Sequence, residues 1–115
     1  MRSMKTGIVS GLMGLVLASA ASASTTSARI ANILIYDGGN MVYVYPAGGI
    51  LNAPGCHGAN GNYYSFSMSR PLAREYLAGL LAAQAQGATV SFYGTNTCAD
   101  QSVSETLAYF SISSP

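Results

Sequence analysis

The chain has 115 residues, of which 50% are hydrophobic and only 8% are charged, and its formal net charge is +1 at pH 7. Proteins that bind nucleic acids hold the phosphates with clustered lysine and arginine side chains. This chain has too few basic residues for such a cluster, and we therefore expect no nucleic-acid partner. The length suits one small domain with a limited hydrophobic core.

The first 23 residues have the layout of a secretory signal peptide. Two basic residues precede an uncharged, mostly apolar run over residues 8–18, and Ala21 and Ala23 form an A-x-A cleavage site. The run is shorter than the roughly 20 residues that cross a bilayer, so we expect no membrane span. We predict a secreted or periplasmic protein, cleaved after Ala23 (a cut after Ala20 is the alternative), with a single domain over residues 24–115.

The predicted mature part begins with a strand hairpin. Residues 24–27 form a short polar lead-in, and residues 29–36 are rich in β-branched side chains, which is typical of a strand. A glycine-containing turn over residues 37–40 leads to a second strand over residues 41–45. Residues 46–61 contain many glycines and prolines and are predicted to be a loop.

A third strand over residues 62–68 precedes the strongest helix signal of the chain, over residues 69–87. Ser69 is a suitable N-cap residue, Pro71 fits the first turn, and Gly87 can adopt the positive φ of a C-terminal cap. Five residues at helical spacing predict the apolar stripe: Ala73, Tyr76, Leu77, Leu80 and Leu81.

Two further strands complete the prediction. Residues 88–93 alternate with period two, residues 94–102 form a turn-rich loop, and residues 103–112 form the last strand. The order β-β-β-α-β-β predicts a mainly β fold with one helix, in the element order of an OB-fold, a five-stranded Greek-key barrel. An open α+β sheet covered by one helix is the alternative.

Both cysteines, Cys56 and Cys98, lie in the predicted exported part. In an oxidising compartment we expect them to form one disulfide, worth roughly 3 to 4 kcal/mol on the chain-entropy model. A metal site or a redox pair is the alternative, but the spacing fits neither, and His57 is the only nearby extra ligand. We therefore expect no metal and no cofactor.

No residue pattern predicts catalysis. His57 is the only histidine, and pairing of Cys56 with Cys98 would remove the free thiolate that a Cys-His dyad needs. The four acidic residues are scattered, and no hydrolase, zinc-protease or phosphate-binding motif is present. We therefore expect that the protein is not an enzyme.

The tyrosines are more informative, because the chain has 8 of them and no tryptophan. Tyrosine suits strands as a large side chain with a polar tip, which would explain them without any function. The alternative is a tyrosine-lined groove for a sugar, in which hydroxyl groups form hydrogen bonds and rings stack on the ligand.

The chain resembles a group of small exported bacterial proteins related to the B subunits of subtilase cytotoxin and of the pertussis-like toxins. The resemblance covers most of the predicted mature part. Besides the signal peptide, four segments carry it: R-I-x-x-I-x-I-Y-x-G at residues 29–38, A-x-L-L-A-A-x-A-x-G-x-T-V at residues 78–90, the Cys98 loop, and E-T-L-x-Y-F-x-I at residues 105–112.

This resemblance implies an OB-fold that assembles as a ring pentamer, binds sialylated glycans on host cells and accompanies a separate catalytic A subunit. It also implies two ligand-binding residues: a serine just before the first strand, matched by Ser27, and a tyrosine at the end of the fourth strand, matched by Tyr93. The next position, a second tyrosine in the toxin subunits, is Gly94 here.

Two hypotheses for the function follow. The first is a secreted, non-catalytic, glycan-binding protein similar to a toxin B subunit. The second is a stand-alone periplasmic or secreted OB-domain that binds or inhibits another protein.

Overall fold

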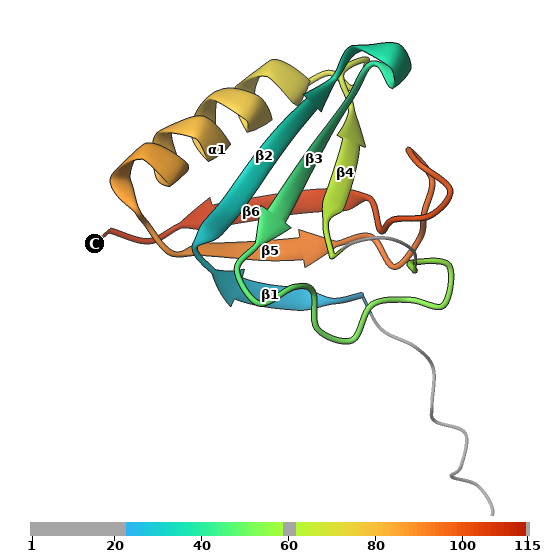
Figure 1. Cartoon of the computed structure of the whole chain (residues 1–115), viewed down its shortest axis with the longest axis horizontal. Coiled ribbons are helices and arrows are strands. Elements are labelled where there is room, and N and C mark those ends of the chain that lie inside the picture. The colour runs from blue at the N-terminus through green and yellow to red at the C-terminus, as the bar shows by residue number, and fades with distance from the viewer. Residues whose placement is uncertain (1–22, 59–61, 115) are drawn as a thin grey trace, which may run out of the picture.

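The computed structural model describes residues 23–58 and 62–114. The predicted signal peptide, residues 1–23, lies outside this part except for Ala23. Within the described residues, two three-stranded antiparallel sheets pack with one α-helix (Figure 1). In chain order the elements are β1 (Thr25–Ala28), β2 (Ile30–Tyr36), the 3-10 helix η3 (Asp37–Gly39), β3 (Met41–Pro46), β4 (Tyr64–Ser67), α1 (Ala73–Gln86), β5 (Val90–Gly94) and β6 (Leu107–Ile112).

One continuous segment contributes to both sheets, because only Arg29 separates β1 from β2. β1 pairs with β5 in the sheet β1-β5-β6, and β2 pairs with β3 in the sheet β2-β3-β4. The prediction of a polar lead-in over residues 24–27 is therefore wrong, since most of it lies in β1. Thr26 is buried in this strand while Thr25 and Ser27 are exposed, so the alternation involves polar residues and carries no hydrophobic signal.

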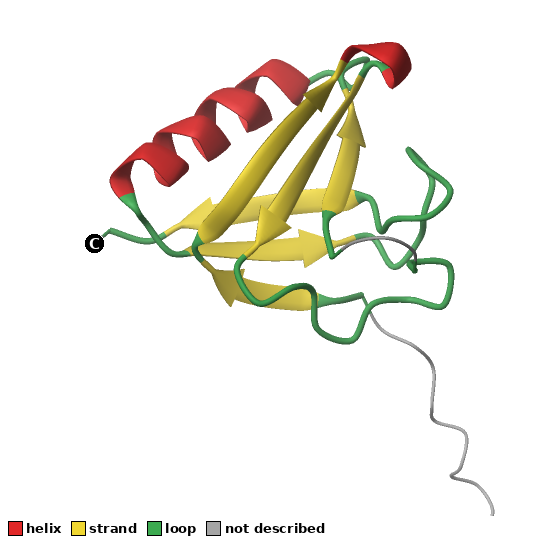
Figure 2. Ribbon diagram, in the orientation of Figure 1, coloured by secondary structure: helices red, strands yellow, loops and turns green. Residues whose placement is uncertain are grey.

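A short contact joins the two sheets at β4. Ser65 forms an isolated parallel bridge with Thr106, just before β6, and its amide donates a hydrogen bond to the Glu105 carbonyl oxygen at 3.1 Å. The sheets are not closed into a barrel by a continuous ladder of the described residues (Figure 2). The predicted mainly β fold with one helix is confirmed. The number of strands differs because the first predicted strand is longer than expected and breaks at Arg29.

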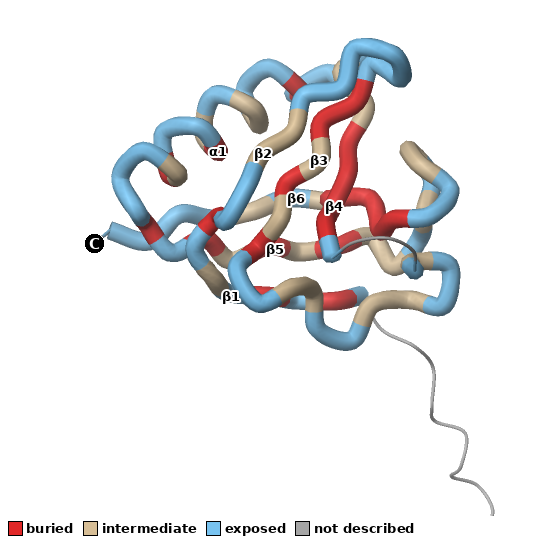
Figure 3. Tube along the Cα trace, in the orientation of Figure 1, coloured by how far each residue is buried: buried red, intermediate tan, exposed pale blue. Residues whose placement is uncertain are grey.

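The core lies between the two sheets and α1, and buried positions gather along β3 and β4 (Figure 3). Tyr64 of β4 stacks on Phe92 of β5 with ring centroids 5.5 Å apart, which packs one sheet against the other. The largest fully buried apolar side chains come from both sheets and the helix: Val42, Val44, Tyr64, Phe66, Leu80, Val90, Phe92 and Leu107.

The helix ends as predicted but begins later. Gly87 has φ 66° and its amide donates to the Gln84 carbonyl oxygen at 3.2 Å, as in a C-terminal cap. The predicted N-cap is wrong, because α1 begins at Ala73 and the Ser69 hydroxyl instead lies 2.7 Å from the Ser67 hydroxyl. Such local side-chain hydrogen bonds compete with helix formation.

The buried face of α1 also differs from the prediction at one position. Ala73 and Leu80 are fully buried and Leu77 is half-buried, as the helical spacing predicts, whereas Leu81 is 42% exposed. Ala83 occupies the next buried position instead. The stripe therefore runs from Ala73 through Leu80 to Ala83, and the prediction for Leu81 is wrong.

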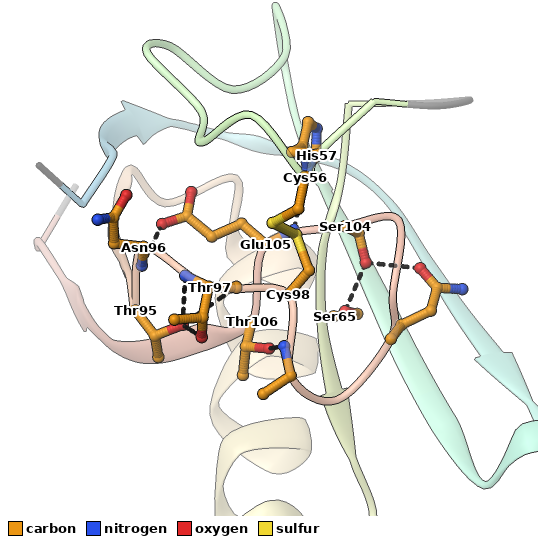
Figure 4. Close-up of a disulfide and its surroundings, with 12 residues drawn as sticks. Cys56, His57, Ser65, Thr95, Asn96, Thr97, Cys98, Ser104, Glu105 and Thr106 are labelled. Atoms are coloured by element: carbon orange, nitrogen blue, oxygen red, sulfur yellow. Dashed lines mark hydrogen bonds between the residues drawn. A yellow bond between two sulfur atoms is a disulfide. The ribbon is translucent and has the colours of Figure 1, made fainter. Parts of the chain in front are cut away.

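The predicted disulfide is confirmed. Cys56, in the loop after β3, is bonded to Cys98, in the loop after β5, with their Cα atoms 6.1 Å apart. The bond links the two sheets through their loops, beside Glu105 and His57 (Figure 4).

Candidate functional site

The outer face of the sheet β1-β5-β6 carries hydroxyl-bearing side chains in two neighbouring rows that run across the strands. Across the sheet, Thr25 lies opposite Tyr93 and Tyr93 opposite Tyr109, while Ser27 lies opposite Ser91 and Ser91 opposite Ser111. The alternate residues of these strands point inward. We call the following six residues the hydroxyl face: Thr25, Ser27, Ser91, Tyr93, Tyr109 and Ser111.

The hydroxyl face combines a flat aromatic surface with a row of small hydroxyl groups. The rings of Tyr93 and Tyr109 are stacked, with centroids 4.4 Å apart and planes 14° apart, and Tyr109 is 56% exposed. The hydroxyl oxygens of Ser27 and Ser91 lie 2.9 Å apart. The six residues include no acidic and no basic side chain. The arrangement can donate and accept hydrogen bonds and can offer a ring face to a ligand.

The structure brings the two predicted ligand-binding residues, Ser27 and Tyr93, onto this one face. They lie on the neighbouring strands β1 and β5, offset by two residues, because Tyr93 is directly opposite Thr25. Side chains at such diagonal positions lie roughly 7 to 8 Å apart. The other four residues of the hydroxyl face were not predicted. The alternation of hydroxyl-bearing side chains along β5 and β6 is the sequence signal that could have indicated them.

Gly94 follows Tyr93, and the structure shows why no side chain stands there. A Cβ atom on Gly94 would lie 2.1 Å from Oε2 of Glu105, a distance that real atoms do not tolerate. The second tyrosine of the toxin subunits therefore could not be accommodated at this position without moving Glu105.

Glu105 is the centre of a polar cluster inside the protein (Figure 4). Its side chain is fully buried, and its carboxylate accepts hydrogen bonds from the Ser24 hydroxyl at 2.5 Å and from the backbone amide of Asn96 at 2.8 Å. The Ser24 hydroxyl also lies 2.6 Å from the hydroxyl of Tyr64. Burial raises the pKa of Tyr64, against the opposing effect of its hydrogen bonds with Ser24 and Thr26. An enclosed carboxylate of this kind holds the structure together and cannot contact a ligand at the surface.

His57 lies at the edge of the same cluster. Its Nδ1 atom accepts a hydrogen bond from the Glu105 backbone amide at 3.0 Å, which fixes the neutral imidazole with its proton on Nε2. Burial lowers the pKa of His57, and the negative charge of Glu105 partly opposes this. Neither Cys56 nor Cys98 is free, so His57 has no thiol partner for catalysis. Among the described residues no three histidine, cysteine or acidic side chains come together as a metal site.

A second group of tyrosines lies on the sheet β2-β3-β4. Tyr43 stacks on Tyr63 with ring centroids 4.5 Å apart, and the Tyr45 ring is tilted against Tyr63 with centroids 5.1 Å apart. The Gln101 side chain joins two of them, donating to the Tyr43 hydroxyl and accepting from the Tyr63 hydroxyl. Burial and the neighbouring tyrosines raise the pKa of Tyr43. This group already satisfies much of its own hydrogen bonding, unlike the exposed Tyr109.

A hollow with a volume of about 190 Å³ lies at the beginning of α1, lined by Arg70, Tyr76 and residues 71–73. The Arg70 guanidinium group donates to the Leu107 carbonyl oxygen at 2.6 Å and lies 3.7 Å from the Asp100 carboxylate. It also lies over the Tyr76 ring, 5.3 Å from the centroid. Arg70 thus holds the helix start against β6, and its charge is engaged within the protein.

Comparisons of the chain with protein-family models, with curated proteins and with solved structures find no match. In the part of the chain that the structure describes, no helix is both long and apolar enough to cross a membrane.

Proposed function

We propose that this chain is an exported, non-catalytic binding protein whose hydroxyl face binds a carbohydrate. The observation that carries the proposal is the set of six hydroxyl-bearing side chains on one uncharged sheet face, with the stacked Tyr93 and Tyr109 among them. A sugar offers hydroxyl groups for hydrogen bonds and a C–H face that packs on an aromatic ring. The resemblance to toxin B subunits independently indicated Ser27 and Tyr93, and both belong to this face.

The same resemblance suggests finer features, which we include in the proposal. OB-type connectivity is supported by the continuous β1–β2 segment and by the parallel bridge between Ser65 and Thr106. Export to the periplasm or the medium is supported by the Cys56–Cys98 disulfide, a bond that persists in oxidising compartments. A sialylated host glycan as ligand, a ring pentamer and a separate A subunit rest on the resemblance alone, although a ring would strengthen weak single sites through multivalency.

The test is glycan binding by the exported protein, screened on an array and then measured in solution. Ser27→Ala and Tyr93→Phe each remove one hydroxyl group, and we expect each to weaken affinity about 2- to 10-fold, the usual range for one hydrogen bond. Tyr109→Ala removes an exposed ring and should weaken binding more. Tyr36→Phe is the matched control, because Tyr36 is 50% exposed on the other sheet.

Two results would count against this proposal. If Tyr36→Phe weakened binding and the variants of the hydroxyl face did not, the site would lie on the sheet β2-β3-β4. If no glycan bound at all, the second hypothesis, a domain that binds or inhibits another protein, would be favoured. Exposed apolar side chains such as Ile35 (59% exposed) and Leu51 (58% exposed) would then be the first positions to mutate.

A further inference from the structure

Within residues 23–58 and 62–114, the buried carboxylate of Glu105 receives hydrogen bonds but has no cationic partner. Its Oε2 atom lies 3.3 Å from the backbone nitrogen of Ser24, in addition to its hydrogen bonds with the Ser24 hydroxyl and the Asn96 amide. The ion pair found among the described residues joins Arg70 to Asp100 and does not involve Glu105. Because an unpaired buried charge is costly, enclosed carboxylates usually have a positive partner.

The position of Ser24 in the chain supplies such a partner. Ser24 is the first residue after the predicted cleavage site, and it is only 1% exposed, whereas Ala23 is exposed. We propose that cleavage after Ala23 creates the counter-ion of Glu105: the new α-ammonium group of Ser24 forms an ion pair with the buried carboxylate. The proposal is independent of the ligand and depends on the predicted site of cleavage.

The chemistry of this step is simple. A signal peptidase uses one water molecule to hydrolyse the Ala23–Ser24 amide, which leaves a carboxylate on Ala23 and an amine on Ser24. The amine takes up a proton at neutral pH, because an α-amino group has a pKa of about 7.7 to 8.0. A contact at 3.3 Å between an uncharged amide and the carboxylate is thereby replaced by a hydrogen bond between two charged groups, which is shorter and stronger.

Two titratable groups contact this pair, and neither supplies the positive charge that Glu105 needs. Tyr64 contacts the Ser24 hydroxyl and is neutral, since burial raises its pKa. His57 contacts the Glu105 amide through Nδ1 and is held in its neutral form. A cut after Ala20 would leave three more residues before Ser24 and would place the new charge away from Glu105.

The composition of the chain provides a clean experiment. The only lysine, Lys5, lies in the predicted signal peptide, so the α-amino group is the only primary amine of the mature protein. We would determine the first residue of the exported protein by intact mass and then measure the rate of α-amine acylation against pH. The reference protein carries two extra alanines before Ser24. We expect a start at Ser24, an amine pKa at least one unit above that of the reference, and acylation about fourfold slower or more at pH 8, because the neutral amine is the reacting form.

Two variants identify the partner of the amine. Glu105→Gln should lower the amine pKa and accelerate acylation, whereas Glu75→Gln, which removes an exposed carboxylate of α1, should leave both unchanged. If Glu105→Gln does not fold, the amine pKa and acylation rate of the exported protein, compared with those of the extended reference, are sufficient to test the proposal. A first residue other than Ser24, or equal acylation rates in these two proteins, would overturn the proposal.

Discussion

At the scale of single residues, Gly94 and Glu105 depend on each other. The Glu105 carboxylate occupies the space where any other residue at position 94 would place its Cβ atom. We therefore expect Gly94→Ala to lower the free energy of unfolding by about 3 kcal/mol or more, because an overpacked core must displace a hydrogen-bonded buried charge. Urea denaturation followed by circular dichroism would measure this loss.

Gly55→Ala is the matched control for that change. A Cβ atom on Gly55 would meet nothing within 4 Å, so its stability should remain within about 0.5 kcal/mol of the wild type. Similar stabilities of the Gly94 and Gly55 variants would mean that Glu105 can move aside at little cost.

His57 should make the stability of the protein depend on pH. Burial lowers its pKa in the folded state, so the unfolded chain takes up the proton first as the pH falls. The contribution of neutral His57 is then fully present above about pH 6.5, the unfolded pKa, and is lost as the pH falls below it. Protonation of Nδ1 would also break the hydrogen bond from the Glu105 amide.

The measurement is the free energy of unfolding between pH 7 and pH 5 for the wild type and for His57→Gln. We expect a steeper decline in the wild type, since glutamine does not titrate while the acidic residues contribute to both proteins alike. Parallel curves would show that His57 is not held in its neutral form.

At the scale of elements, α1 contributes to the core through one narrow face. Leu80 is fully buried, and Leu81, the adjacent residue, is 42% exposed. Leu80→Ala should destabilise the protein by about 2 to 5 kcal/mol, as large-to-small core substitutions do, whereas Leu81→Ala should cost much less. Chemical denaturation of the two variants side by side is the measurement, and equal losses would place the buried face of the helix elsewhere.

The features that local sequence signals describe were predicted well. The end of α1 at Gly87, the strands β3 and β5 and the disulfide follow from local signals: a glycine that adopts positive φ, alternation of large side chains, and two cysteines in an exported chain. β1 was missed because the buried residues there, Ser24 just before the strand and Thr26 within it, are polar and form hydrogen bonds with Glu105 and Tyr64.

The candidate site was predicted only in part, for a related reason. Ser27 and Tyr93 were identified by resemblance, but Tyr109 and Ser111 joined them only when the pairing of β5 with β6 was known. Register decides which residues share a sheet face, and register is set by long-range packing rather than by local sequence. The buried cluster around Glu105 was not predicted at all, since Ser24 and Glu105 lie 81 residues apart in the chain.

At the scale of the whole molecule, two narrow connections join the sheets in addition to the core, the helix α1 and the Cys56–Cys98 disulfide. One is covalent, the chain through Arg29 between β1 and β2. The other is the bridge at Ser65, whose amide donates to the Glu105 carbonyl oxygen and whose hydroxyl lies 2.6 Å from the Ser104 hydroxyl. Ser65, Ser104 and Glu105 are all fully buried, so separation of the sheets there would expose unpaired polar groups.

We therefore expect the sheets to open together. In native-state hydrogen exchange, the Ser65 amide should exchange with a free energy close to that of global unfolding, like the buried amides at the centre of β3. The Thr97 amide is the control, because it lies in an exposed turn with a local hydrogen bond to the Thr95 hydroxyl and should exchange much faster. If Ser65 exchanged as fast as Thr97 while β3 stayed protected, the two sheets would be separable units held together mainly by the core and the disulfide.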